Sequence, residues 1–382
     1  MFKLILLLSL IFCETGFAKT DQPKHLWKRE FKTEINALAL SKDSSKIALT
    51  VKPEIKEYKE DKDKNYYDDK RMEWFGSKLY YLDNKGKVLW EYEAKKMEEL
   101  DNVVMSENGD YIACSVKELI TEDREIGYYI GSSGKYKYEI KKWQEWKYKE
   151  ARFFNSKGKL LWSFKGRIDQ CQISSDGNYI FLIPEADEEH NPFDNFYFLN
   201  KEGKKIWEIS PGKYRTTYWM ANDANRIIIA DTLYDRNGKI LWKLPPNNFF
   251  VRISKNGSYA TVHYIPPYDV QEVWSGYIKI SCADLNQKRI LWEKNAKEID
   301  PYYFIDESKG YLVTWMDERF EEGKLKEGEM RIYDLKTGKI IKKTLNPTDF
   351  FKYEKTYLNR GKKYIAEKEG NSLNYYTLGA TK

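Results

Sequence analysis

Histidine is scarce in this chain of 382 residues, which contains only His25, His190 and His263. They fall in an outer strand, an insertion and an inner strand of the repeat described below, so we do not expect a metal site built from histidines. The chain contains no GxSxG, HExxH or Walker motif, and no GxGxxG between a strand and a helix. Each of these motifs would carry a specific chemistry. Without them we predict a protein that is not an enzyme and holds no cofactor.

Cysteine is nearly as rare, and no CxxC pair occurs. Cys114, Cys171 and Cys282 each stand inside a strand-like segment, whereas Cys13 lies close to the N-terminus. Small buried strand residues are the simplest interpretation of the first three. We therefore predict three reduced, buried thiols, with no disulfide framework and no cysteine-bound metal.

The chain also lacks a hydrophobic run long enough to span a membrane, which takes about 20 apolar residues. The apolar run Leu4–Phe12 has nine residues, follows a basic start and precedes the small residues Gly16 and Ala18. This pattern is typical of a signal peptide over residues 1–18 and predicts a periplasmic or secreted protein. Leu10–Cys13 also resembles a lipobox, so a lipid anchor at Cys13 is one alternative, and an uncleaved anchor is another.

No block of lysine and arginine stands out, although the formal net charge is +6. Acidic and basic residues are interspersed, which indicates a solvated surface and predicts no nucleic-acid partner. Helical periodicity is nearly absent as well. Aromatic residues, in contrast, make up 16% of the chain and include 30 tyrosines, a composition that favours β-strands.

One unit, residues 168–211, shows how the chain is organised. It reads as four short strands, around Gln170–Ser174, Tyr179–Pro184, Asn195–Asn200 and Lys204–Ile209. Asp-Gly and Glu-Gly turns join them in pairs, because glycine supplies the positive φ that a tight hairpin needs. The inner pair recurs at residues 37–49, 103–116, 171–183, 218–230, 251–262, 303–314 and 356–367, and the outer pair ends at Trp90, Trp162, Trp207, Trp242, Trp292 and Ile341.

Seven inner pairs but six complete outer pairs imply that the seventh outer pair is split between the chain ends. Ser372–Leu378 supplies its third strand, and His25–Glu30, with the same Leu-Trp signature, supplies its fourth. This is how a propeller closes its ring. We predict an all-β, monomeric, seven-bladed β-propeller over residues 19–382. The repeated tryptophans are predicted to cap the interface between neighbouring blades: Trp27, Trp90, Trp162, Trp207, Trp242 and Trp292.

The spacing between repeats is unequal, and the extra residues always fall between the second and third strands of a blade. The insertions are Lys52–Ser77, Lys117–Glu150, Glu185–Asp194, Ile265–Gly276 and Asp317–Glu329. All should emerge on one face, and segregated long loops are often functional. Their aromatic residues would be binding anchors for a protein or a sugar, or would pack onto the blade tips. The candidates are Trp74, Tyr128, Tyr129, Trp143, Trp146, Tyr268 and Trp274.

On the same face, charged residues precede several inner strands and should approach the mouth of a central channel. Asp101, Asp169, Arg215 and Asp300 are the candidates. A cation or a charged ligand would suit them, but aspartates at such positions commonly cap the N–H groups of turns.

The repeat resembles two families. Asp-x-x-Gly-Lys-x-Leu-Trp, as in Asp83–Trp90, is similar to the outer strands of pyrroloquinoline-quinone-like β-propellers, and Ser174–Ile180 resembles the inner hairpin of WD-repeat-like bacterial propellers. The quinone enzymes have eight blades, an adjacent-cysteine disulfide, a calcium site and a stacking tryptophan. This chain has no adjacent cysteines and reads as seven blades, so the resemblance implies a non-catalytic member.

Three functions therefore remain open. The first is an exported scaffold that binds a protein partner in the cell envelope through the long-loop face. The second is a propeller that binds carbohydrate or peptidoglycan with its rim aromatics. The third is an enzyme with a site at the channel mouth. The sequence favours the first.

Overall fold

The structure, a computed structural model, describes most of the chain between Lys24 and Thr377, and the predicted signal peptide and Cys13 lie outside the described residues. The part that it describes contains strands and turns only, so no helix there has the length and apolar character needed to cross a membrane. The described residues are 24–56, 73–130, 135–185, 195–210, 217–244, 248–264, 279–295, 302–316, 319–321, 324–326, 329–345, 359–360 and 364–377.

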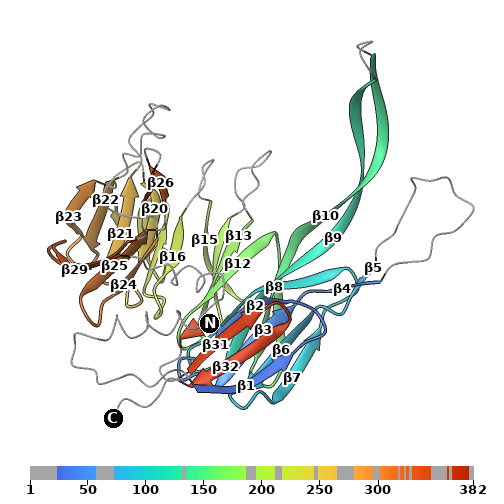
Figure 1. Ribbon diagram of the computed structural model, residues 1–382, viewed down its shortest axis with the longest axis horizontal. Coiled ribbons are helices and arrows are strands. Elements are labelled where there is room, and N and C mark those ends of the chain that lie inside the picture. Colours follow the sequence, from blue (N-terminus) through green and yellow to red (C-terminus); the bar gives the residue numbers. More distant parts are fainter. Residues whose placement is uncertain are drawn as a thin grey trace, which may run out of the picture.

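Seven four-stranded antiparallel sheets follow one another along the chain (Figure 1). The first contains β2 (Ile35–Leu40), β3 (Lys46–Val51), β6 (Lys78–Asp83) and β7 (Val88–Glu93). The second contains β8 (Glu98–Met105), β9 (Tyr111–Ile130), β10 (Lys135–Asn155) and β11 (Leu160–Lys165). The third contains β12 (Ile168–Ile173), β13 (Tyr179–Pro184), β14 (Phe196–Asn200) and β15 (Lys205–Ile209).

The remaining sheets repeat this order. The fourth contains β16 (Tyr218–Met220), β17 (Arg226–Ile229), β18 (Thr232–Asp235) and β19 (Ile240–Lys243). The fifth contains β20 (Asn248–Ile253), β21 (Tyr259–Tyr264), β22 (Lys279–Asp284) and β23 (Arg289–Asn295). The sixth contains β24 (Tyr302–Asp306), β25 (Tyr311–Met316), β28 (Glu329–Asp334) and β29 (Ile340–Leu345). The seventh contains β30 (Asn359–Arg360), β31 (Tyr364–Glu369), β32 (Ser372–Thr377) and β1 (Lys24–Glu30). We call the strands of each sheet A to D in this order.

The seventh sheet confirms the predicted pairing of the two chain ends. β1 runs antiparallel to β32, with Glu30 opposite Ser372 and Lys24 opposite Thr377. Trp27 stacks on Tyr375 with ring centroids 5.0 Å apart. The N-terminal strand therefore covers an edge of the last sheet that would otherwise be open.

Each D strand has the same backbone irregularity, at the position of the Leu in the Leu-Trp signature. In the third sheet, Phe198 faces Trp207 but Leu199 faces Lys205, so Ile206 is one residue too many on its strand. Such a β-bulge bends and twists the strand locally. The same position is occupied by Leu26, Leu89, Leu161, Leu241, Leu291 and Ile341 in the other sheets.

In six of the seven sheets a tryptophan follows the bulge, and it contacts the next sheet, as predicted. The Trp207 indole N–H donates to the carbonyl of Arg236 at 2.9 Å, in the C–D turn of the fourth sheet, and the ring lies against Gly238 of that turn. Trp242 packs against the core shared by the fourth and fifth sheets. The same donation to the next sheet's C–D turn is made by Trp27, Trp90, Trp162 and Trp292.

The hydrophobic core lies between sheets rather than inside one of them. Each cluster of buried residues draws on two consecutive sheets, from the seventh with the first to the fifth with the sixth. Central strands such as β13 are buried at nearly every position, which explains the weak alternation in their sequences. Among the described residues, no such cluster joins the sixth sheet to the seventh.

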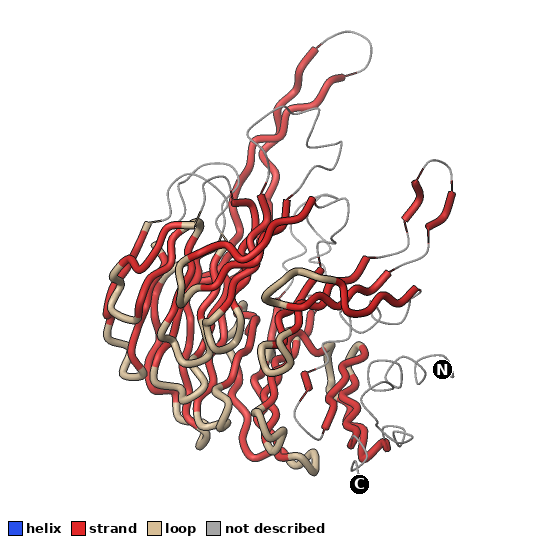
Figure 2. The backbone as a smooth tube through the Cα atoms, turned by 90° about the vertical axis from the view of Figure 1, so that its left-hand side faces the viewer, coloured by secondary structure: helices blue, strands red, loops and turns tan. Residues whose placement is uncertain are grey.

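Short turns and long connections leave the sheets at opposite ends. Figure 2 shows the A–B and C–D turns gathered at one end of the sheets and the longest hairpin leaving from the other. The described parts of the insertions in the first, second and sixth sheets form hairpins between strands B and C, as predicted for the second sheet. They are β4 (Glu54–Lys56) with β5 (Glu73–Phe75), the long ends of β9 and β10, and β26 (Arg319–Glu321) with β27 (Lys324–Lys326).

Candidate functional site

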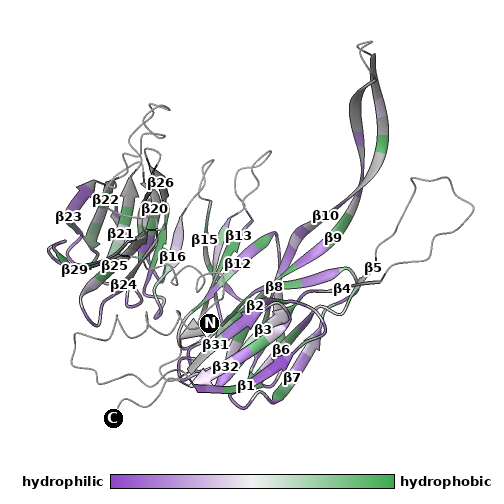
Figure 3. Ribbon diagram, in the orientation of Figure 1, coloured by the Kyte–Doolittle hydropathy of each residue, from purple (hydrophilic) through white to green (hydrophobic). Residues whose placement is uncertain are grey.

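The longest hairpin, made of β9 and β10, is the most prominent feature of the long-loop end (Figure 1). The two strands pair continuously from Asn155 opposite Tyr111 to Lys135 opposite Ile130, with one irregularity between Tyr148 and Glu150. Only their lower parts belong to the four-stranded sheet. We call residues 117–130 and 135–149 the ribbon. Figure 3 shows that the described positions of the ribbon are largely hydrophilic, with isolated hydrophobic residues.

A buried ion-pair network holds the base of the ribbon. The Arg152 guanidinium donates to Glu98 and to Glu150, each at 2.7 Å, and to the Tyr92 hydroxyl at 3.1 Å. The Arg152 and Glu98 side chains are only 3% and 1% exposed. Burial alone would raise the pKa of Glu98, but the hydrogen bond and charge of Arg152 outweigh it and lower that pKa. Tyr92 belongs to β7, so the network also ties the ribbon to the first sheet.

A second polar network lies where the first three sheets meet. Asp101 accepts hydrogen bonds from the side chains of Asn36 and Tyr148, each at 3.0 Å, and pairs with Lys117 at 2.5 Å. Asn102 donates to both the carbonyl and the carboxylate of Asp169, at 2.8 and 3.1 Å. We call this set the junction network. It joins residues of β2, β8, β9, β10 and β12, and therefore fixes the ribbon relative to its neighbours.

The chemistry of Tyr148 follows from its position in the junction network. Burial raises the pKa of its hydroxyl, and the carboxylates of Asp169 and Asp101 raise it further. The hydroxyl therefore stays protonated and donates to Asp101. Lys117 lies 4.7 Å above the Tyr148 ring, an arrangement in which a cation is attracted to the ring face.

Two of the four residues predicted at a channel mouth are thus brought together. Asp101 and Asp169 are bridged by Asn102 and Tyr148, as described above, while Arg215 and Asp300 lie outside the described residues. Both aspartates already have protein partners, and the described part of the chain holds no group of three or more His, Cys, Asp or Glu residues suited to a metal ion. The junction network positions the base of the ribbon relative to the first and third sheets.

Most of the predicted rim aromatics lie on the ribbon. Tyr128 and Tyr129 belong to β9, Trp143 and Trp146 to β10, and Trp74 to β5. Trp146 is half-buried, and Tyr268 and Trp274 lie outside the described residues. The structure adds two exposed positions that the sequence did not single out, Tyr138 and Ile140, which are 61% and 75% exposed. The sequence signal that could have identified them is that Tyr138 and Ile140 alternate with charged residues along β10.

The opposite end of the sheets carries a feature that the sequence did not suggest. In five consecutive A–B turns, the backbone N–H of one turn donates to the carbonyl of the next, from Lys42 to Glu107, Ser175, Asn222 and Lys255, at 2.6–3.0 Å. We call these five residues the turn ring. Its bonds depend on how neighbouring sheets are placed, which no local sequence pattern reports.

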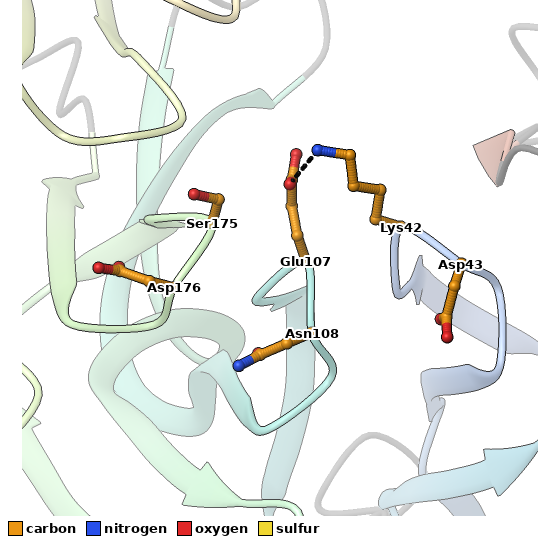
Figure 4. Close-up of a pocket in the computed structure, with 6 residues that line it drawn as sticks. All are labelled: Lys42, Asp43, Glu107, Asn108, Ser175 and Asp176. Atoms are coloured by element: carbon orange, nitrogen blue, oxygen red, sulfur yellow. Dashed lines mark hydrogen bonds and ion pairs between the residues drawn. The ribbon is translucent and has the colours of Figure 1, made fainter.

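An open cavity of about 490 Å³ lies beside the turn ring (Figure 4). Lys42 and Glu107 pair across it at 2.6 Å. The other two carboxylates accept hydrogen bonds within their own turns. Asp43 accepts one from the backbone N–H of Ser45, and Asp176 accepts one from the backbone N–H of Asn178. The polar groups of the cavity therefore stabilise the turns. The lining residues are Lys42, Asp43, Glu107, Asn108, Ser175 and Asp176.

No protein-family model matches the chain, and no curated protein matches it.

Proposed function

We propose that the seven sheets close into a seven-bladed β-propeller, and that the protein is an exported, non-catalytic scaffold that binds a protein partner in the cell envelope through the ribbon. The N-terminal run of residues 1–18 supports export, and the pairing of β1 with β32 supports closure.

The ribbon carries the proposal. A two-stranded hairpin alone is marginally stable in water, yet this one continues far beyond its sheet. Its base is fixed by two separate networks, around Arg152 and around Asp101. A long arm with a rigid base presents a large surface away from the sheets, which suits a macromolecular partner better than a small substrate. Exposed Tyr138 and Ile140 supply apolar area for such a contact.

The test removes most of the ribbon and keeps its base. Residues 120–145 are replaced by Asn-Gly, a favoured two-residue hairpin turn, which joins the paired Leu119 and Trp146. We expect an unchanged melting temperature and the loss of the partner recovered from an envelope fraction by the intact protein.

A matched control changes the other end of the sheets. Lys157→Glu and Lys204→Glu alter exposed C–D turn residues and should leave recovery of the partner intact. Loss of the partner in this control, with retention in the trimmed protein, would show that the opposite face is the functional one. A fluorescence titration with glycan fragments tests the carbohydrate alternative, because binding at the ribbon would change its tryptophan emission.

A further inference from the structure

The ribbon has two long backbone edges that its own sheet does not cover. β8 pairs with β9 only as far as Glu118, and β11 pairs with β10 only as far as Glu150. Two more backbone bonds close the base, from Leu119 to Met97 and from Gly166 to Lys149. Above them, in the described part of the chain, β9 and β10 pair only with each other. An uncovered strand edge is a template for adding another strand.

The two edges differ in charge. Residues 135–149 of β10 include six lysines and two glutamates, whereas residues 117–130 of β9 include four acidic residues against Lys117 and Arg124. Some of these charges neutralise one another within the ribbon, as in the pair between Lys147 and Glu122 at 2.9 Å. The sequence therefore gives the β10 side of the ribbon an excess of lysine over glutamate, and we expect that edge to be basic.

The basic edge also alternates in character along the strand. Successive residues of a strand lie on opposite faces, so Tyr138 and Ile140 share one face of the ribbon and both are exposed. The alternate positions carry Lys135, Lys137 and Lys141 in the sequence. Glu139 is the fourth residue of that alternate set, which by sequence is therefore net positive over 135–141. A strand added here would run beside exposed Tyr138 and Ile140 on one face and beside these mainly basic positions on the other.

We infer that the free edge of β10 binds an extended acidic segment of a partner protein as an added β-strand, with acidic and apolar residues alternating in that segment. This inference rests on the proposed function and names the chemistry of the partner. A second copy of the chain fits less well, because symmetric pairing would place one lysine-rich strand beside another, and lysine on edges opposes such pairing.

The experiment uses the full-length protein and a peptide of about ten residues, the upper length of a common strand, in which glutamate alternates with leucine. Fluorescence anisotropy measures binding, and a peptide with lysine in place of glutamate is the comparison. We expect the acidic peptide to bind at least about tenfold more tightly, and its affinity to fall as salt screens the charges.

Hydrogen exchange locates the added strand. Binding should slow exchange at alternate amides of residues 135–148 and leave residues 120–130 unchanged, because a strand donates outward through every second N–H. The double substitution Lys137→Glu and Lys141→Glu should lower the affinity for the acidic peptide by about tenfold or more. Lys157→Glu with Lys204→Glu, which changes the net charge equally at the opposite end of the sheets, should not.

The alternatives give different results. Equal binding of the lysine peptide, or protection of β9 in place of β10, would overturn the inference. So would a dimer in sedimentation whose β10 amides are protected without peptide, since a second copy would then occupy the edge. If the envelope partner needs the ribbon but the acidic peptide does not bind, this inference fails and the proposed function stands. If the partner still binds the trimmed protein, the proposed function fails whatever the peptide does.

Discussion

Single residues hold one sheet against the next through the contact between a tryptophan and a glycine. Trp162 donates its indole N–H to the carbonyl of Lys201 at 2.8 Å, and its ring covers Gly203. The hydrogen bond fixes the direction of the indole, and the glycine lets the ring approach the backbone. A side chain at the glycine would disturb both.

Gly203→Ala tests this contact. A Cβ at position 203 would lie 2.9 Å from the Trp162 ring, and φ is +79°, a value that strains alanine. We expect a loss of about 1–3 kcal/mol in the free energy of unfolding, measured by urea denaturation. Gly310→Ala is the control, because φ is +69° there but nothing lies within 4 Å. Equal losses in the two variants would mean that the indole contact adds nothing to the backbone strain.

Breaking the buried ion pair of Arg152 and Glu98 should lower the free energy of unfolding by more than Gly203→Ala does. Arg152→Met leaves Glu98 buried without its main partner, and breaking a buried ion pair costs about 3–5 kcal/mol. Arg167→Met, which removes a more exposed pair with Glu185, should cost about 1 kcal/mol or less. Thermal unfolding of both variants measures the difference, and similar losses would contradict the structural role of Arg152.

The same pair predicts a dependence on pH. Because the pKa of Glu98 is lowered in the folded protein from its ordinary value of 4.5, the unfolded chain binds its proton first as pH falls. The stability that Glu98 contributes is therefore present above pH 4.5 and is lost as pH falls through the folded-state pKa. In Glu98→Gln this acid-dependent part should disappear, so its unfolding free energy should change less between pH 6 and pH 3 than that of the parent protein. An identical slope in both proteins would show that other carboxylates account for the acid sensitivity.

The low reactivity that we expect of the three thiols follows from their burial alone. Cys114, Cys171 and Cys282 are buried and free, and burial raises the pKa of Cys171 and of Cys282 to about 12. Since the thiolate is the reactive form, all three should react slowly with a thiol reagent at pH 8 until denaturant is added. Rapid labelling of the native protein would contradict this.

At the scale of strands, local chemistry was enough to predict the repeat. Tyr179–Pro184 is found where its sequence placed it, and Lys204–Ile209 differs from β15 by one residue, because tight turns such as Ser175–Asn178 fix where each strand stops. The ribbon was predicted as a hairpin, but its full length was not. β9 and β10 can pair continuously only because the second sheet, at their base, fixes the register in which the two strands meet. A single sequence does not show that register.

The two polar networks could not be predicted in the same way. Asp101 and Asp169 are far apart in the chain, and Asn102 connects them only because strands A of the second and third sheets lie side by side. Asn102 has φ +47°, a left-handed conformation that asparagine tolerates better than most residues. Neither the conformation nor the pairing leaves a signal in one sequence. The turn ring is hidden for the same reason.

At the scale of the whole molecule, repeated contacts among the described residues join consecutive sheets from the seventh through the first to the sixth. Where the other D strands have tryptophan, the sixth sheet has Lys342 opposite Ile332. The seventh sheet, in turn, has no C–D turn to receive an indole, because its last two strands come from opposite chain ends. Among the described residues, neither an indole contact nor a buried cluster joins the sixth sheet to the seventh. The N-terminal strand instead joins the seventh sheet to the first, through Trp27 and Phe31. We therefore expect the position of the seventh sheet to depend on this strand.

Deletion of residues 19–31 tests that dependence. The deletion removes β1, its pairing with β32, the hydrogen bond from Trp27 to the carbonyl of Asn84 at 2.8 Å, and buried Phe31. Ser372–Thr377 would then present an open edge. We expect a lower melting temperature and oligomers in light scattering, both reversed by adding a peptide of residues 24–31. Deletion of residues 19–23 alone should change neither. A monomer with an unchanged melting temperature after the longer deletion would show that the seventh sheet is stable without its N-terminal strand, and that the ends of the chain do not hold the molecule together.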